Sequence, residues 1–114
     1  MPNMYVWRKN DYSIPLVAKV NGVVRDITGA TIYFTVKENE TDAYADAKIK
    51  KTITEHDAPI IGESTLSLTH DDTNLTAKEY HFAFLLVTSD GDEETLGDGK
   101  FIVNQNICFD YDIV

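Results

Sequence analysis

The sequence has a single cysteine, a single tryptophan, three prolines and no long apolar run. With Cys108 alone, no internal disulfide is possible, which is compatible with a reducing compartment. Its neighbours Ile107 and Phe109 are apolar and disfavour a reactive thiolate. No apolar run approaches the ~18 residues of a spanning helix, and the opening residues lack a basic and apolar leader. We therefore expect a soluble chain that is not exported and has no membrane partner.

Positive charge is also scarce. Ten Lys and Arg residues stand against nineteen Asp and Glu residues, for a formal net charge of -9. Such a surface repels polyanions, so nucleic acid is excluded as an expected partner. The 114 residues, 43% of them hydrophobic, predict one folded domain over 1–114. Its core is expected at about 8–103, and 104–114 is expected to be an extra strand or an arm.

The clearest structural pattern lies in residues 27–37. After a glycine turn, Ile32, Phe34 and Val36 alternate with polar or amphipathic side chains. A period of two places these three residues on one side of a strand, facing a core. The stretch therefore predicts a half-buried strand of an antiparallel, two-layer β structure.

Two further patterns predict the structure of the residues before this strand. Residues 12–20 alternate, with Val20 as the last inward position, and Pro15 indicates a strand that is at an edge or bulged. The pair Asn21-Gly22 then predicts a tight hairpin, because both central residues of a type I′ turn need positive φ.

Three lysines mark the next strand, in residues 48–54, and they are typical of an edge strand protected against further pairing. Residues 62–69 return to alternation and are expected to pair with it. Between the central strand and the lysine strand, residues 38–47 predict a loop or a short helical turn.

The most apolar run covers residues 80–87 and is apolar on both faces, which predicts a central strand or an outer face covered by another chain. Tyr80 at its start resembles the tyrosine corner of immunoglobulin-like sandwiches. Later, Gly97-Asp98-Gly99 predicts a bulge. The strand and turn spacing as a whole predicts an all-β, immunoglobulin-like antiparallel β-sandwich of about seven to eight strands.

Candidate chemistry is sparse. His56 lies between two carboxylates, but no nucleophile or orienting group stands at a recognised spacing, so we expect no enzyme. The carboxylates of 38–47 lack the glycine turn of a known calcium loop, and His70 with its two following aspartates is a weak metal pattern. We therefore assign no catalytic, cofactor or metal site.

Interface candidates are more numerous. Trp7 either closes one end of the core, the commoner use of such an aromatic, or docks on a neighbour. The tail after residue 104 alternates in the same way as a strand and is an alternative contact. The candidate interface residues are Tyr5, Trp7, His81, Leu85, Val87, Phe109 and Tyr111.

The order of these features is similar to that in a known family of proteins. Its most recognisable parts are the block Asp26-Ile27-Thr28-Gly29-Ala30-Thr31 and the corner from Leu75 to Tyr80. Around them lie residues 8–11, Asn21-Gly22, 62–69, Ser89-Asp90-Gly91 and Gly99-Lys100-Phe101. Over about residues 8–103 the chain resembles the N-terminal domain of phage baseplate upper proteins and other small tailed-phage sandwich proteins.

The resemblance implies a virion component that is made in the bacterial host cytoplasm, docks with other tail or baseplate proteins and has no catalytic residues. We expect it to work as a symmetric homo-oligomer or as a ring on a larger assembly. The alternative is a carbohydrate-binding sandwich, for which Tyr5, Trp7, Tyr33 and Tyr44 are the candidate aromatics.

Overall fold

The computed structural model describes residues 3–105, and nine strands lie in this part of the chain. They form a five-stranded sheet, a two-stranded sheet and a short hairpin. Two single 3₁₀ turns, η1 and η2, interrupt the connections. In chain order the elements are β1 (Met4–Trp7), β2 (Tyr12–Val17), β3 (Lys19–Val20), β4 (Val23–Val24), β5 (Thr31–Lys37), η1 (Tyr44–Asp46), β6 (Ile49–Ile53), η2 (Pro59–Ile61), β7 (Glu63–Leu68), β8 (Glu79–Val87) and β9 (Glu93–Asn104).

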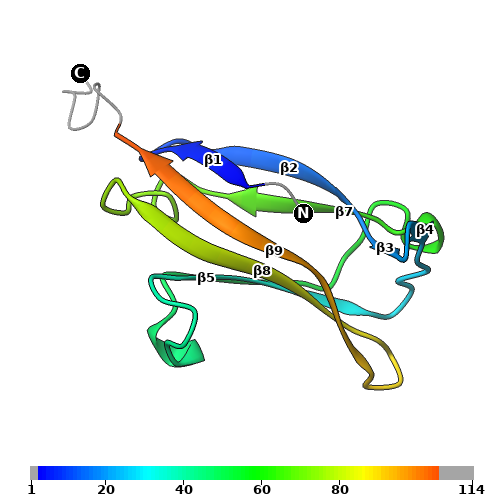
Figure 1. The fold of residues 1–114 in the computed structure, drawn as a ribbon. Helices are drawn as coiled ribbons and strands as arrows, with labels where there is room; N and C mark the ends of the chain where they lie inside the picture. Colours follow the sequence, from blue (N-terminus) through cyan, green and yellow to red (C-terminus); the bar gives the residue numbers. More distant parts are fainter. Residues whose placement is uncertain (1–2, 106–114) are drawn as a thin grey trace.

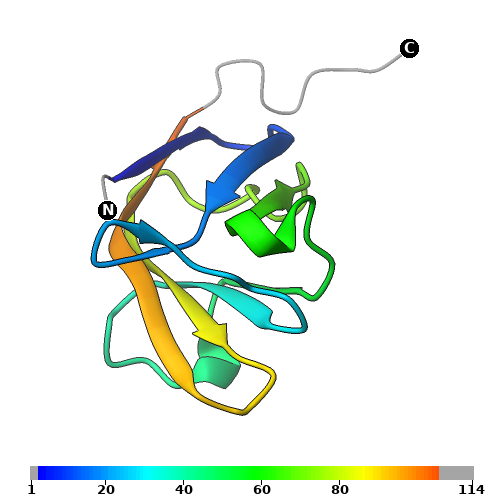
Figure 2. The same cartoon turned by 90° about the vertical axis from the view of Figure 1, so that its right-hand side faces the viewer.

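The strands are arranged in two layers. The larger sheet has the order β1-β9-β8-β5-β6, and the pair β2-β7 lies across from it (Figure 1). Viewed after a quarter turn, β8 and β9 curve side by side along the molecule (Figure 2). The prediction of an all-β sandwich is confirmed. One pair differs from the antiparallel prediction, because β1 runs parallel to β9.

The core follows the predicted alternation. Ile32, Phe34 and Val36 of β5 are fully buried, and Leu66 and Leu68 of β7 reach them from the other layer. On β8 the inward positions are equally buried; they are Tyr80, Phe82, Phe84 and Leu86. As predicted, β8 is central, paired with β5 on one side and β9 on the other.

Phe34 is the centre of an aromatic cluster. Its ring centroid lies 4.8 Å from that of Phe84, 6.0 Å from Phe82 and 6.2 Å from Phe101. These separations and the tilted geometries are those that aromatic pairs prefer. The cluster joins β5, β8 and β9 into one packed face.

The predicted turns form with the predicted geometry. Asn21 and Gly22 have φ of 53° and 78° and join β3 to β4. The Tyr80 hydroxyl donates to the Thr76 carbonyl at 2.8 Å, which is the expected tyrosine corner. Burial raises the pKa of Tyr80, although Lys78 opposes the shift.

The alternation of apolar residues does not predict which strands pair. The lysine strand β6 is at an edge of the large sheet, as expected, but it pairs with β5 and not with β7. Its predicted partner β7 pairs with β2 in the other layer. The period of a strand determines which face is buried and leaves the choice of neighbour open.

The glycine-rich part of β9 is irregular, as predicted. Phe84 of β8 faces Gly97 while the next residue, Leu85, faces Thr95, so Leu96 has no partner. The extra residue is a β-bulge, and it directly precedes Gly97-Asp98-Gly99.

Candidate interaction surface

An aromatic corner lies at the edge of the large sheet, where β1 exposes Tyr5 and Trp7. Their exposed fractions are 65% and 54%, whereas Val6 between them is buried. Because β1 turns Val6 inward, Trp7 does not close the core, and the end-plug interpretation is wrong. On its outer edge the Trp7 amide donates to the Tyr12 hydroxyl at 2.7 Å, which holds the corner in place.

The outer face of β8 carries three more candidate residues. His81, Leu85 and Val87 are half-buried and point away from the core. Leu85 lies beside Tyr33 on β5, and Val87 lies beside Thr31. This outer face therefore combines apolar positions at one end with polar positions around His81.

The five described candidates share one sheet face but do not form one patch. Tyr5 is opposite Ile102 of β9, and Leu85 is opposite Thr95 of the same strand. At 3.3 Å per residue, these rows are on the order of 20 Å apart. The remaining two candidates, Phe109 and Tyr111, lie outside the described residues.

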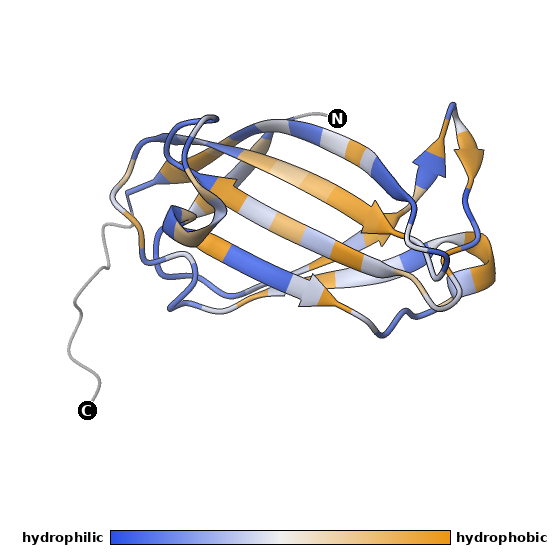
Figure 3. Cartoon of the chain, turned by 90° about the horizontal axis from the view of Figure 1, so that it is seen from below, coloured by the Kyte–Doolittle hydropathy of each residue, from blue (hydrophilic) through white to orange (hydrophobic). Residues whose placement is uncertain are grey.

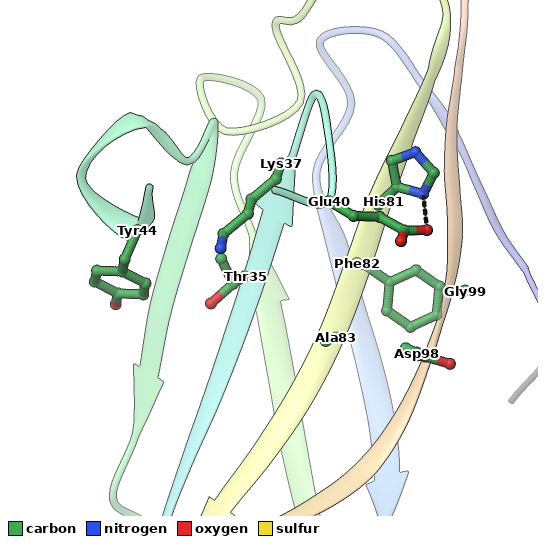
Figure 4. A pocket seen from close by; sticks show the side chains of 9 residues that line it. All are labelled: Thr35, Lys37, Glu40, Tyr44, His81, Phe82, Ala83, Asp98 and Gly99. Carbon is green, nitrogen blue, oxygen red and sulfur yellow. Dashed lines mark ion pairs between the residues drawn. The ribbon is translucent and has the colours of Figure 1, made fainter. Parts of the chain in front are cut away.

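Between the row of Tyr5 and the row of Leu85, the outer face has a hollow of about 420 Å³ (Figure 4). Ala83 provides a low floor, and His81 bonds through Nδ1 to Glu40 at 3.3 Å. On the far side Tyr44 of η1 is half-exposed, with Lys50 Nζ 5.3 Å from its ring centroid. The other polar groups on the rim are those of Thr35, Lys37 and Asp98.

The acidic segment 38–47 forms the wall of this hollow and contains the expected short turn, η1. Lys78 hydrogen-bonds Glu38 and lowers the pKa of that carboxyl, with a further contribution from Lys48. Within residues 3–105, no group of three or more His, Cys, Asp or Glu side chains is placed to hold a metal ion. His70 instead contacts Asp11, at 3.0 Å through Nδ1.

His56 has a different environment from the one that its sequence neighbours suggest. Its Nε2 lies 2.8 Å from the Ala30 carbonyl, and its Nδ1 lies 2.8 Å from the Ser64 hydroxyl. Since a carbonyl only accepts, Nε2 carries the proton and Nδ1 accepts from Ser64. A serine beside a histidine is also a nucleophile and base pattern, but Ser64 is buried and does not line the hollow on the outer face. The pair connects the two layers.

Replacing His56 by Ala is expected to reduce the free energy of unfolding by about 1–3 kcal/mol, because the buried Ser64 hydroxyl loses its partner. Urea denaturation measures the change. His70→Ala, at a half-exposed position, is the control and should change stability by less than about 0.5 kcal/mol. Equal effects of the two variants would contradict the bridging role.

A second connection joins β6 to the turn after β7. Lys51 Nζ lies 2.7 Å from Asp72 Oδ2, and the Thr69 amide donates to the same oxygen at 2.8 Å. Burial opposes ionisation of Asp72, but the hydrogen bonds from Lys51 and Thr69 outweigh it and lower the pKa of the carboxyl. Asp72 therefore stabilises the fold in its ionised form.

This lowered pKa predicts a pH dependence. A carboxyl with a depressed folded pKa contributes stability above its unfolded pKa, near 3.9, and loses it as the pH falls through the folded pKa. At pH 7, Asp72→Asn should be less stable than wild type by about 1 kcal/mol. The gap should close as the pH falls below about 4, as measured by urea denaturation at several pH values. A gap that persists at low pH would contradict this assignment.

An apolar tip was missed by the sequence reasoning. It lies at the end of the molecule where the β3-β4 hairpin meets η2, and Figure 3 colours β4 and much of η2 as hydrophobic. Val20, predicted to face inward, is exposed, because Ala18 already bonds to Gly62 and the chain leaves the layer there. The exposed side chains of the tip are Val17, Val20, Val23, Val24, Ile60 and Ile61.

A sequence signal for the tip does exist. Val23-Val24 and Ile60-Ile61 are pairs of adjacent aliphatic residues next to turns. Adjacent residues of a strand point to opposite faces, so both members of the Val23-Val24 pair cannot be buried under one layer. Such pairs indicate exposed apolar surface.

In the described part of the chain, the helical turns are all too short to cross a membrane. In comparisons with known proteins, no family model matches the chain, and no curated protein is detectably similar to it.

Proposed function

We propose that the chain is a non-enzymatic structural or assembly protein of a tailed phage or prophage particle, in its baseplate, tail or neck. It would act through protein–protein interfaces, with other tail or baseplate proteins and further copies of itself as partners. It would be assembled in the bacterial host cytoplasm and remain in the virion. The sequence resemblance to phage baseplate upper proteins supports the particle, and the aromatic corner supports the mode of action.

The exposed aromatic corner is the observation that carries this proposal. Trp and Tyr are the residues that most often dominate the binding energy of an interface, because each buries a large, rigid surface. Both side chains of the corner are more than half exposed on a strand that is itself firmly held. Glu79 and Tyr5 both lie opposite Ile102 of β9, so a carboxylate is near the corner. This charge favours association with a specific partner over nonspecific association.

The test uses a bacterial host that carries the gene. Particles from induced cells are separated on a density gradient, and the chain is detected with an antibody. We expect the chain in the particle fraction, in a fixed ratio to the major tail protein. Complete particles that lack the chain, with all of it left at the top of the gradient, would overturn the proposal.

The hollow on the outer face favours a second candidate, a carbohydrate-binding module. Sugar rings bind where an exposed aromatic ring and hydrogen-bonding groups line one hollow, and here Tyr44 lies across the hollow from Glu40 and His81, with Lys37 between them. An array of bacterial surface polysaccharides tests this function. Binding that Tyr44→Ala abolishes and Tyr5→Ala preserves would support it; absence of binding to all sugars would exclude it.

A further inference from the structure

The apolar tip continues into a second hollow, of about 330 Å³, between the end of β2 and the large sheet. Val17 belongs to both features, and Leu96 at the bulge forms the opposite wall. Ile32 and Phe84 give the hollow an apolar interior. A projecting apolar hairpin and a largely apolar hollow, whose lining also includes Lys19, therefore occur at the same end of the molecule.

Three backbone contacts hold the tip rigid. The Ala18 amide donates to the Gly62 carbonyl at 2.8 Å, and the Arg25 amide donates to the Ala18 carbonyl at 2.9 Å. The Ile27 amide donates to the Pro59 carbonyl at 2.9 Å. These bonds fix the hairpin beside η2, so the six exposed side chains are presented with little conformational freedom to lose on binding.

We propose that the apolar tip is a contact between two copies of this chain, related by a two-fold axis. The β3-β4 hairpin of each copy enters the hollow of the other, with Val23, which is 69% exposed, as the leading side chain. In a two-fold interface both copies use the same surface, so the hairpin of each copy must fit the hollow of the other. Here the hairpin and the hollow lie on the same surface, and this requirement is met. The inference rests on the proposed function, since it names a copy of the chain as one of the assembly partners.

Charge favours a second copy at this place. The chain carries a net charge of -9, so most surfaces of two copies repel each other. Residues 12–25 are the longest stretch without a carboxylate and contain Lys19 and Arg25. From other strands, Glu94 neutralises Arg25 at 3.2 Å, and Glu63 lies opposite Val17. The tip is thus nearly balanced in charge, and two tips meet without the repulsion of the remaining surface.

The area sets the strength of the contact. Six aliphatic side chains at these exposures offer on the order of 500 Å² per copy, so a symmetric contact buries roughly 1,000 Å² in total, the lower end for specific interfaces. A dimer held by such an area is weak and concentration-dependent. It is suited to forming when copies are gathered on a particle.

Sedimentation equilibrium of the full chain at a series of concentrations tests the inference. The variants Val23→Glu and Ile60→Glu place a carboxylate at exposed tip positions, where each should leave the fold intact as judged by circular dichroism. Thr52→Glu, at an exposed position of the edge strand β6 that belongs neither to the tip nor to the lining of its hollow, is the matched charge control. We expect wild type and Thr52→Glu to form dimers and each tip variant to weaken the dimer at least tenfold.

A wild-type chain that stays monomeric at millimolar concentration would overturn the inference, and so would tip variants that dimerise as tightly as wild type. A wild-type dimer that Trp7→Ser disrupts and the tip variants do not would also overturn it, while leaving the aromatic corner as the copy contact. The proposed function is judged separately, by the presence of the chain in particles.

Discussion

Phe34→Ala should lower the free energy of unfolding by about 4 kcal/mol, the largest effect that we expect from a single core substitution. Phe34 is fully buried and packs against Phe82, Phe84 and Phe101. The substitution removes most of a side chain from the centre of three strands, which cannot collapse into the space because they are hydrogen-bonded to one another. Since small domains are stable by only about 5–15 kcal/mol, much of the native stability is lost.

Urea denaturation followed by circular dichroism measures this effect. Phe34→Leu, which keeps most of the apolar volume, should cost less than about 1.5 kcal/mol. Tyr44→Ala removes an aromatic ring that is half-exposed and serves as the surface control, with an expected change below about 0.5 kcal/mol. If Phe34→Ala and Tyr44→Ala had similar effects, the packing of the two layers would not be as described.

Gly62→Ala should be the second most damaging of the changes proposed, with a loss of about 3 kcal/mol. Gly62 has a φ of 75°, in the left-handed region that side chains disfavour. An added Cβ would also lie 2.7 Å from the Arg25 carbonyl oxygen and 2.8 Å from that of Ala18. Both atoms belong to the backbone, so relief requires the hairpin and η2 to move apart.

Gly22→Ala is the matched control for this prediction. Gly22 has a similar φ of 78°, but an added Cβ meets nothing within 4 Å. Its substitution should therefore cost only the conformational term, about 1 kcal/mol. Thermal and urea unfolding of the two variants measure the difference, which is the cost of the backbone clash. Equal losses would contradict the close backbone contact of Gly62 with Arg25 and Ala18.

Much of the fold could be predicted because local patterns have one solution. Ile32, Phe34 and Val36 are separated by polar or amphipathic residues, so only one face of their strand can be buried. Asn21-Gly22 predicts its turn because few other residues accept positive φ. The alternation of a strand does not determine which strand it pairs with. The pattern of β7 is as suitable as that of β5, yet β6 pairs with β5.

The candidate interaction surface was harder to predict, for two physical reasons. In β1 both alternating sets are apolar, so the period does not tell whether Val6 or Trp7 is inside; burial of Val6 places Trp7 outside. At Val20 the alternation of the preceding strand continues in the sequence after the chain has left the layer. Tertiary hydrogen bonds, which no local pattern reports, decide both positions.

The incorporation of variants into particles tests most directly the claim that the aromatic corner docks this sandwich onto partner proteins. Tyr5→Ser with Trp7→Ser removes the corner, and Tyr44→Ser removes a comparably exposed aromatic from the hollow. All variants are expressed in a host whose own copy of the gene is deleted, and particle-bound protein is quantified after gradient purification. We predict that the double variant folds but is depleted from particles at least tenfold, while Tyr44→Ser is incorporated as wild type. Incorporation of the double variant at the wild-type level would contradict the claim.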